Sequence, residues 1–321
     1  MKKNDEGIRS LLNLRHNLVK AVREFFYMRG YIEVETPSLL AASAPDPYID
    51  PLKVFTESKG PFYLHTSPEM HMKRLLQHGI ERCFQICRVY RVEEHEEVHS
   101  TEFTMLEWYS NGDYTDAMKE TEELVRFAAE RAGTDKEKKY KKPFDVYLLE
   151  ELFIEITGLD PFLMQRDALF NAMTERGFAG IDEKDDWNSL FFKLLVQEIE
   201  PELAKRDNYF IKDWPLSIST MARKKDLNKV ERFELYINGL EIANGYTELL
   251  DPAEQRSRFE EDNRERKRLG KKTFVIDEDF IESLARLKGP YAGVSLGIDR
   301  LLMALLDKKN IDEVTVNRFK V

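Results

Sequence analysis

Residues 88–109 read RVYRVEEHEEVHSTEFTMLEWY, two extended segments on either side of an acidic turn. Side chains alternate between the two faces of a strand, so Arg91 and Glu93 share a face of the first segment. Three side chains share a face of the second segment: Phe103, Glu107 and Tyr109. Two such strands would form the floor of a cleft that holds a nucleotide triphosphate beside a cationic small molecule. A solvent-exposed strand pair would show the same alternation, so the rest of the sequence has to discriminate.

Composition indicates a globular protein. The 321 residues are 42% apolar, which is enough for a large core in one or two domains. The 49 basic and 59 acidic side chains give a net charge of -10. Nucleic-acid backbones require clustered Lys and Arg, so a tRNA or DNA partner would need a local basic patch.

The cysteines and the N-terminal sequence bear on the cellular compartment. Cys83 and Cys87 lie close together on an apolar strand, and no His/Cys set has structural-zinc spacing, so both are expected to be reduced core residues. The N-terminus, MKKNDEGIRS, lacks the apolar segment of a signal peptide, and no run is long enough to span a bilayer. We therefore expect a cytoplasmic protein without a membrane partner.

Periodicity and turn residues predict many short strands joined by hairpins. Residues 8–29 have helical spacing, and the alternating segment 31–35 ends in Thr36-Pro37, which favours an edge strand. A helix at 68–76 is expected to begin with Ser67 as its N-cap. Further strands are expected at 52–55, 62–65, 84–93, 102–109, 209–214, 232–237, from 240 onward and at 292–296. Further helices are expected at 114–132, as a helical stretch from about 143 to 200, at 252–269, at 277–288 and from Asp299, which would cap the last one.

This order of elements favours an α+β fold, an antiparallel sheet flanked by helices, because hairpins replace regular crossover helices. A single domain over 1–321 is expected, with a largely helical insertion at about 114–205. The run KEKKYKK at 136–142 is expected to be a solvated loop, with docking of an acidic partner as the alternative. The sequence has no GxGxxG after a strand and no GxxxxGK(S/T), so neither a dinucleotide fold nor a P-loop is supported.

The dipeptide Asn238-Gly239 predicts a hairpin with a type I′ turn. Its register would pair Ile237 with Leu240 and Glu234 with Ala243. Glu234 and Glu241 then share a face as diagonal neighbours, with roughly 7–8 Å between their backbones. Their carboxylates are close enough to hold Mg²⁺ together with phosphate oxygens. An exposed acidic ribbon is the alternative.

Two further segments carry polar side chains at regular positions. EIANGYTELLD (241–251) places Asn244, Tyr246 and Glu248 at alternate positions. GVSLGIDRLLMAL (293–305) is a glycine-punctuated strand that enters a helix with Arg300 in its first turn. An arginine there can stack on adenine or clamp a terminal phosphate, whereas a surface arginine on an amphipathic helix is the alternative.

Together with Thr36-Pro37, these stretches resemble the three signature motifs of class II aminoacyl-tRNA synthetases, and the residues between them narrow the resemblance to the lysine-type enzymes. The resemblance extends over nearly the whole chain, through HTSPEMHMKRLL (65–76), FQICRVYRVEE (84–94), EFTMLEWY (102–109), ERFELYINGLEIANGYTEL (231–249) and GVSLGIDRLLMAL (293–305). It implies a class II synthetase catalytic fold and the use of ATP and Mg²⁺.

For the ATP site, the resemblance implies a role for each matching residue. Arg91 would grip the α-phosphate and the substrate carboxylate, and Arg91 and Arg300 would be the catalytic residues. Glu93 would read the adenine amino group, with Phe103 beneath the base and Arg300 above it. The other matches are His99 near the triphosphate, and Glu234 and Glu241 as magnesium ligands.

The resemblance also implies a lysine pocket, whose acids hold the two amines of the substrate. It consists of Glu69, Glu107, Tyr109, Asn244 and Glu248. This is physically sensible, because a buried ammonium must be paired and three convergent acids are unfavourable without cations. Ser67 and Ser295 replace an alanine and a glycine of lysine-charging enzymes, which makes the pocket around the α-carbon smaller and more polar and favours a different lysine isomer.

Two departures from the tRNA-charging enzymes change the expected acceptor. The first helix begins almost at residue 1, so no anticodon-binding domain is expected before it. The loop VEEHEEVHS (92–100) is acidic and lacks the arginine usual in this family, which is unfavourable for contact with an RNA acceptor stem and leaves the hold on the γ-phosphate open.

A chain truncated in this way resembles the elongation factor P lysine ligases, stand-alone paralogues that attach lysine, preferably β-lysine, to a lysine side chain of that translation factor. The resemblance implies a lysyl adenylate intermediate and a two-fold homodimer through the first helix and the strand that ends in Thr36-Pro37. A minimal enzyme that charges tRNA with lysine is the nearer alternative, and a catalytically inactive lysine-binding regulatory paralogue is the other.

Overall fold

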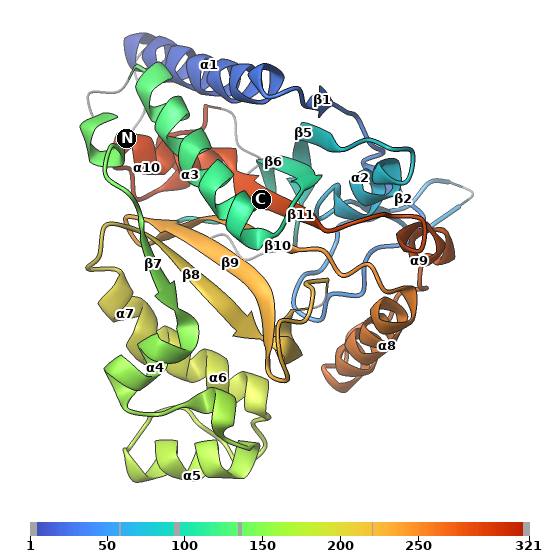
Figure 1. Cartoon of the computed structure of the whole chain (residues 1–321), viewed down its shortest axis with the longest axis vertical. Coiled ribbons are helices and arrows are strands. Elements are labelled where there is room, and N and C mark those ends of the chain that lie inside the picture. Colours follow the sequence, from blue (N-terminus) through green and yellow to red (C-terminus); the bar gives the residue numbers. More distant parts are fainter. Residues whose placement is uncertain (1–4, 58, 93–96, 134–136, 220, 317–321) are drawn as a thin grey trace.

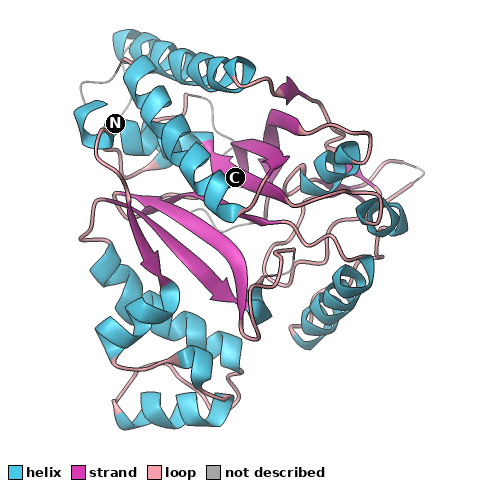
Figure 2. Ribbon diagram, viewed as in Figure 1, coloured by secondary structure: helices cyan, strands magenta, loops and turns pink. Residues whose placement is uncertain are grey.

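An eight-stranded sheet forms the centre of the computed structural model, which describes residues 5–57, 59–92, 97–133, 137–219 and 221–316 (Figures 1 and 2). In spatial order the strands are β1 (Ile32–Glu33), β5 (Arg82–Tyr90), β6 (Glu102–Asn111), β11 (Tyr291–Gly297), β10 (Leu240–Thr247), β9 (Lys229–Ile237), β8 (Asn208–Pro215) and β7 (Asp145–Leu148). Neighbours are antiparallel except at the two edges, where β1 pairs with β5 and β7 with β8 in parallel. The expected α+β fold, an antiparallel sheet flanked by helices, is confirmed.

Three helices cover one face of the sheet: α1 (Asp5–Met28), α3 (Tyr114–Arg131) and α10 (Ile298–Leu306). α3 packs on β9, β10 and β11, α10 packs on β6 and β10, and α1 contacts both helices. Asp113 starts α3 with a capping box, in which its carboxylate accepts hydrogen bonds from the first-turn N–H groups. The apolar sides of the helices merge with the sheet in one core that fully buries Phe26, Trp108 and Leu302.

Three further helices pack one on another beside strand β6. Helix α2 (Glu69–Leu76) packs against α9 (Glu278–Leu284) and β6, and α9 also contacts α8 (Pro252–Arg268). A small second sheet has the order β2 (Leu39–Leu40), β4 (Phe62–Leu64) and β3 (Lys53–Val54). Strand β2 is absent from the sequence-based prediction, since two residues are too short to show alternation.

Helices α4 (Leu149–Thr157), α5 (Arg166–Glu175), α6 (Trp187–Leu194) and α7 (Glu200–Leu203) form one core with β8 at the far end of the sheet (Figure 1). Short 3₁₀ segments lie at Glu137–Tyr140, Pro161–Leu163, Leu216–Ile218 and Ile311–Glu313, and a π segment at Leu195–Ile199. The prediction of helix throughout 143–200 is wrong at β7. Residues 145–148 pair in parallel with β8, which is distant in the sequence. Tertiary pairing therefore decides their conformation.

Two further expectations concern the lysine-rich run at 136–142 and the two cysteines. In the lysine-rich run, Tyr140 is buried, and its hydroxyl donates to the carbonyl of Ala304 at 3.2 Å, so this part of the run is anchored and is not a fully solvated loop. Cys83 is buried and Cys87 half-buried; both are free thiols, and burial raises the pKa of each to about 12. Across the described ranges, every helix is too short or too polar to cross a membrane.

Candidate active site

A cavity of about 480 Å³ lies against β6, β10 and β11 and collects most of the residues that the sequence singles out. Its wall includes Ser67, Glu69, Arg91, His99, Phe103, Glu241, Asn244, Ser295 and Arg300. Four more predicted residues are buried outside the wall: Glu107, Tyr109, Glu234 and Glu248. Glu107 contacts Ser67 and Ser295 of the wall, and Glu234 contacts Arg232 of the wall. Tyr109 and Glu248 are linked to the wall indirectly, through Glu107 and Lys73. Glu93 lies outside the described residues. We call the wall around Arg91, Arg232 and Arg300 the arginine end, and the wall around Ser67 and Glu69 the carboxylate end.

Arg91 and Phe103 lie side by side at the arginine end. The N–H of Arg91 donates to the carbonyl of Thr101 at 3.0 Å, which extends the pairing of β5 and β6 by one residue. Its Nε donates to the carbonyl of Thr66 at 3.2 Å, and its Cζ lies 5.3 Å from the centre of the Phe103 ring. A fixed cation beside a flat apolar ring is a surface on which an adenine base and its phosphates can bind.

Arg300 occupies the first turn of α10, as the sequence predicts. Its Nη1 donates to the carbonyl of Glu241 at 3.0 Å and lies 3.4 Å from the Glu241 carboxylate, while Nε donates to the carbonyl of Val98 at 3.4 Å. An ion pair with a carboxylate that is 39% exposed contributes little, so a phosphate group can compete with it for the guanidinium.

The prediction that Asp299 caps α10 is wrong. The helix begins at Ile298 with Gly297 in the N-cap position. The Asp299 carboxylate instead accepts hydrogen bonds from the N–H of Thr104 at 2.8 Å and from Arg15 at 2.5 Å. Because the Asp299 side chain is buried, these bonds fix the start of α10 to β6 and α1, and so hold the arginine end in place.

Glu234 is a buried acid behind the arginine end. Its carboxylate accepts hydrogen bonds from Arg232 at 2.6 Å and from the hydroxyl of Tyr236 at 2.8 Å. Burial and the nearby Glu241 charge raise the pKa of Glu234 to about 7, against the opposing effect of Arg232. A divalent cation bound between the two carboxylates would favour the ionised form of Glu234.

The hairpin that carries these acids differs from its predicted register. Asn238 and Gly239 have φ values of 55° and 75°, as a type I′ turn requires, and the Ile237–Leu240 pair is present. A β-bulge after Glu241 then shifts the pairing by one residue. The predicted pair of Glu234 with Ala243 is therefore wrong, and Glu234 lies opposite Asn244.

The bulge determines which side chains share a face. Without it, Asn244 and Tyr246 would point away from the face of Glu241, because successive side chains alternate. The extra residue brings them onto that face, so both ends of the cavity are built on the same side of the sheet.

Glu107 is the centre of the carboxylate end. Its Oε2 accepts hydrogen bonds from the hydroxyls of Ser67 at 2.7 Å and Ser295 at 2.9 Å, and its Oε1 from the hydroxyl of Tyr109 at 2.6 Å. Burial and the Glu69 charge raise the pKa of Glu107 to about 7, and the three hydroxyls oppose this shift. The structure thus brings together the predicted residues of β6, β11 and the start of α2.

Ser67 precedes α2 by one more residue than predicted. The N-cap residue is Pro68, and the helix begins at Glu69. The Ser67 hydroxyl still accepts a hydrogen bond from the N–H of Glu69 at 3.0 Å while it donates to Glu107. One side chain therefore both fixes the start of the helix and orients the buried carboxylate.

Lys73 is a residue of this site that the sequence-based prediction missed. Its side chain is 1% exposed, and its Nζ lies 2.5 Å from Oε1 of Glu69 and forms an ion pair with Oε2 of Glu248. Burial raises the pKa of Glu248 to about 8, although Lys73 opposes the shift. The signal in the sequence is the Glu69–Lys73 spacing of four residues, which places both side chains on one face of a helix.

Gly293 allows Glu248 and Tyr109 to approach each other. A Cβ built on Gly293 would overlap the Glu248 carboxylate and the Tyr109 ring. The glycine in the motif at 293–305 is therefore required by packing at the carboxylate end.

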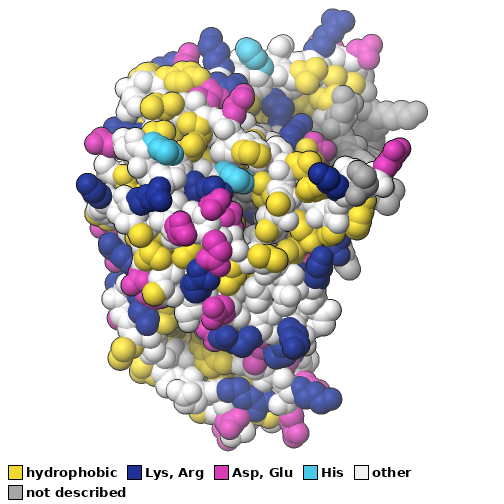
Figure 3. Space-filling view, turned by 90° about the vertical axis from the view of Figure 1, so that its right-hand side faces the viewer, with side chains coloured by type: hydrophobic (Ala, Val, Ile, Leu, Met, Phe, Trp, Pro, Cys, Tyr) yellow, Lys and Arg dark blue, Asp and Glu magenta, His cyan; other side chains and the backbone are white. Residues whose placement is uncertain are grey.

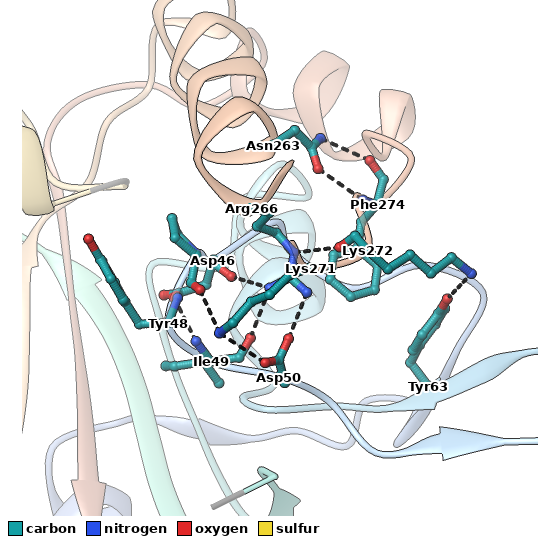
Figure 4. A network of polar contacts seen from close by, with 11 residues as sticks. Asp46, Tyr48, Ile49, Asp50, Tyr63, Asn263, Arg266, Lys271, Lys272 and Phe274 are labelled. Atoms are coloured by element: carbon teal, nitrogen blue, oxygen red, sulfur yellow. Dashed lines mark hydrogen bonds and ion pairs between the residues drawn. The ribbon is translucent and has the colours of Figure 1, made fainter. Parts of the chain in front are cut away.

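The outer wall of the cavity includes the loop 44–50, which is fastened to the end of α8 (Figure 4). The buried Arg266 guanidinium donates to the carbonyl of Asp46 at 2.5 Å, to the carboxylate of Asp50 at 2.6 Å and to the carbonyl of Lys272 at 2.7 Å. Lys271 adds an ion pair with Asp50 at 3.0 Å. One buried arginine thus joins two loops and holds this wall against the cavity.

Comparison with known proteins identifies the family. The protein-family model for class II tRNA synthetases (D, K and N) matches residues 1–317. The chain belongs to this family of class II synthetases. A curated relative from Pseudoalteromonas translucida, named elongation factor P–(R)-beta-lysine ligase, is 37% identical over 314 residues, 94% of this chain and 93% of the relative. Relatives of the same name from Vibrio atlanticus and Vibrio cholerae are each 36% identical and cover 96% and 97% of this chain and 95% of their own length.

The resemblance inferred from the motifs is thereby confirmed. In this class II synthetase the arginine end and the carboxylate end open into one cavity, so a phosphate group and an ammonium group can be bound next to each other. Within the described ranges, no cluster of three or more His, Cys, Asp or Glu forms a metal site by itself. Glu234 and Glu241 fit a magnesium ion only if phosphate oxygens and water complete its octahedral shell.

Proposed function

We propose that this class II synthetase uses ATP to activate lysine, with β-lysine preferred, and transfers it to a lysine side chain of elongation factor P. The relatives above are named for this reaction and align over almost their whole length. The observation that carries the proposal is a cavity in which acids that suit ammonium groups lie beside arginines that suit phosphates.

In the proposed complex the nucleotide lies at the arginine end. The adenine base stacks on Phe103 with Arg300 on its other side, and Glu93 reads its amino group. His99 lies near the triphosphate, and Arg91 contacts the α-phosphate. Glu234 and Glu241 would hold Mg²⁺, which would supply positive charge to the phosphate oxygens.

The amino acid lies at the carboxylate end, with its carboxylate toward Arg91. Its two ammonium groups are held by acids, and the polar wall is completed by two further side chains. The acids are Glu69, Glu107 and Glu248, and the further side chains are Tyr109 and Asn244. The Ser67 and Ser295 hydroxyls both reach Glu107, so they narrow the space next to the substrate's α-carbon and support the preference for the β-isomer.

The reaction needs no protein nucleophile. A carboxylate oxygen of the substrate attacks the α-phosphorus, the bond from phosphorus to the bridging oxygen breaks, and pyrophosphate leaves. The neutral ε-amine of the acceptor lysine then attacks the carbonyl carbon, AMP leaves, and the new amide nitrogen gives up a proton. Arg91 stabilises the charge on the α-phosphate in both steps, and catalysis is chiefly positioning and electrostatics.

We further propose a cytoplasmic homodimer whose 321 residues form one catalytic domain with a largely helical insertion. Large apolar side chains that are about half exposed or more lie along α1 and at the β1 edge, which supports a dimer contact there: Leu12, Tyr27, Met28 and Ile32. On the face shown in Figure 3, basic and acidic side chains are mixed among apolar ones, so that face offers no extended basic track for tRNA.

Transfer to a protein is tested by intact-mass measurement of elongation factor P after incubation with ATP, Mg²⁺ and either α-lysine or β-lysine. We expect the mass to rise by one lysyl residue, with faster transfer from β-lysine. Unfractionated tRNA is offered in a parallel reaction with labelled lysine. Label on tRNA and none on elongation factor P would contradict the proposed acceptor and favour the tRNA-charging alternative. No lysine-dependent ATP–pyrophosphate exchange would favour the inactive regulatory alternative.

A further inference from the structure

Lys73 is a positive charge buried inside a pocket proposed to bind positive charge. Besides its two acidic partners, its Nζ lies 3.5 Å from the sulfur of Met221 and 5.3 Å from the centre of the Tyr246 ring. Burying an ammonium is costly even when it is paired, and an apolar side chain of similar size is often at least as stabilising. Packing alone therefore does not explain a lysine at this position.

The charge count of the pocket suggests a reason. Glu69, Glu107 and Glu248 carry three negative charges when ionised, and Lys73 offsets one of them. In the part of the chain that the structure describes, the ion pairs of these three acids are those with Lys73. Two negative charges remain, and lysine and β-lysine each bring two ammonium groups.

The geometry of the contacts agrees with this count. Lys73 contacts Oε1 of Glu69 and Oε2 of Glu248, one oxygen of each acid. Oε1 of Glu248 is buried without a hydrogen-bond partner in the described structure, and Glu69 is 19% exposed on the cavity wall. Lys73 thus engages one oxygen of each acid and leaves the other oxygen of each unengaged by this ammonium.

We propose that Lys73 is a positioning and specificity-determining residue, whose ammonium orients Glu69 and Glu248 and sets the pocket charge to match a substrate with two ammonium groups. This inference rests on the proposed function. A substrate with one ammonium group, such as norleucine, leaves one buried carboxylate without a cation, which is unfavourable. The pocket therefore discriminates by charge as well as by shape.

Four proteins test the inference: the wild type, Lys73→Met, Glu248→Gln and the double variant. Each single change breaks the charge balance in one direction, whereas the double variant keeps two negative charges and no internal cation. The readout is KM and kcat for lysine, β-lysine and norleucine in ATP–pyrophosphate exchange, with thermal unfolding measured alongside. Lys229→Met is the matched control, because Lys229 forms an ion pair with Glu150 away from the cavity.

We expect each single variant to raise KM for lysine on the order of tenfold, since a charged hydrogen bond contributes roughly that factor, with a smaller change in kcat. The double variant should recover most of this loss, and Glu248→Gln should discriminate less between lysine and norleucine. Wild-type KM in Lys73→Met, or losses in the double variant that simply multiply, would overturn the inference.

The experiment distinguishes failure of this inference from failure of the proposed function. If Lys73→Met does not fold, the comparison of Glu248→Gln with the double variant decides: recovery in the double variant supports charge matching, and a further loss overturns it. If the wild type shows no exchange with lysine or β-lysine, the proposed function is wrong and this inference falls with it. Exchange in the wild type that Lys73→Met retains unchanged contradicts the inference alone.

Discussion

Arg300 combines a weak internal ion pair with a position on the cavity wall, so its guanidinium is available to a ligand. Arg300→Ala removes the cation proposed to stack on the adenine base, and we expect lysine-dependent ATP–pyrophosphate exchange to fall by about 30-fold, since a desolvated cation–π contact contributes roughly 2 kcal/mol. Arg256→Ala is the control, since its exposed pair with Glu278 lies away from the cavity, and its rate should stay unchanged. Full exchange activity in Arg300→Ala would refute its assigned role.

Glu107 makes lysine binding depend on pH. Its pKa is about 7, because burial and Glu69 favour the neutral acid, yet an ammonium group needs the carboxylate. Below pH 7 the site is mostly protonated, so apparent affinity for lysine should fall with decreasing pH, by at most about tenfold per unit for this group. KM measured from pH 6 to 8.5 checks this, and Glu107→Gln should bind weakly at every pH. A KM that stays constant over this range would contradict the assignment.

At the scale of elements, the loop 44–50 is held by the buried Arg266 guanidinium together with Lys271. Arg266→Met leaves the carbonyl groups of Asp46 and Lys272 without this donor and leaves Asp50 with Lys271 alone, so we expect a loss of about 1–3 kcal/mol in the free energy of unfolding, typical of unsatisfied buried groups. A looser wall should also raise KM for both substrates. Denaturant unfolding and exchange kinetics measure the two effects.

The control for this prediction is two residues away on the same helix. Arg268 forms ion pairs with Asp186 and Glu265, and half of its side chain is exposed, so Arg268→Met should change the free energy of unfolding by less than about 1 kcal/mol. Equal losses of unfolding free energy in the two variants would show that the contacts of Arg266 with the loop 44–50 contribute no more than a surface ion pair.

Local sequence rules predict the β9–β10 hairpin only in part. The turn at Asn238-Gly239 and the shared face of Glu234 and Glu241 follow from local rules, and both are present. The bulge does not follow, because an extra residue is set by the pairing of β10 with β11 as well as with β9. Lys73 was missed for a related reason: spacing shows that it can meet Glu69, but only the fold brings Glu248 to the same ammonium.

At the scale of the whole molecule, strand alternation and hairpin signals were sufficient to predict the central sheet, and the signature motifs to predict the family. Strand β7 could not be predicted, since its partner β8 lies beyond four intervening helices. Strand alternation placed Phe103, Glu107 and Tyr109 on one face, whereas the roles of the site residues came from the signature motifs. Their convergence on one cavity depends on strands β6, β10 and β11 being adjacent in the sheet, which is a property of topology.

The proposed dimer is a property of the whole molecule, and its contact can be removed without touching the cavity. Met28 and Ile32 are 68% and 54% exposed at the α1–β1 edge, so a charge at either side chain costs little in a monomer but is unfavourable in a dry interface of roughly 800 Å² per partner. We expect the wild type to sediment as a dimer and Met28→Glu/Ile32→Glu as a folded monomer. Leu227→Glu, at a side chain 88% exposed elsewhere, should remain a dimer. A monomeric wild type, or a double variant that still dimerises, would contradict a dimer through this edge.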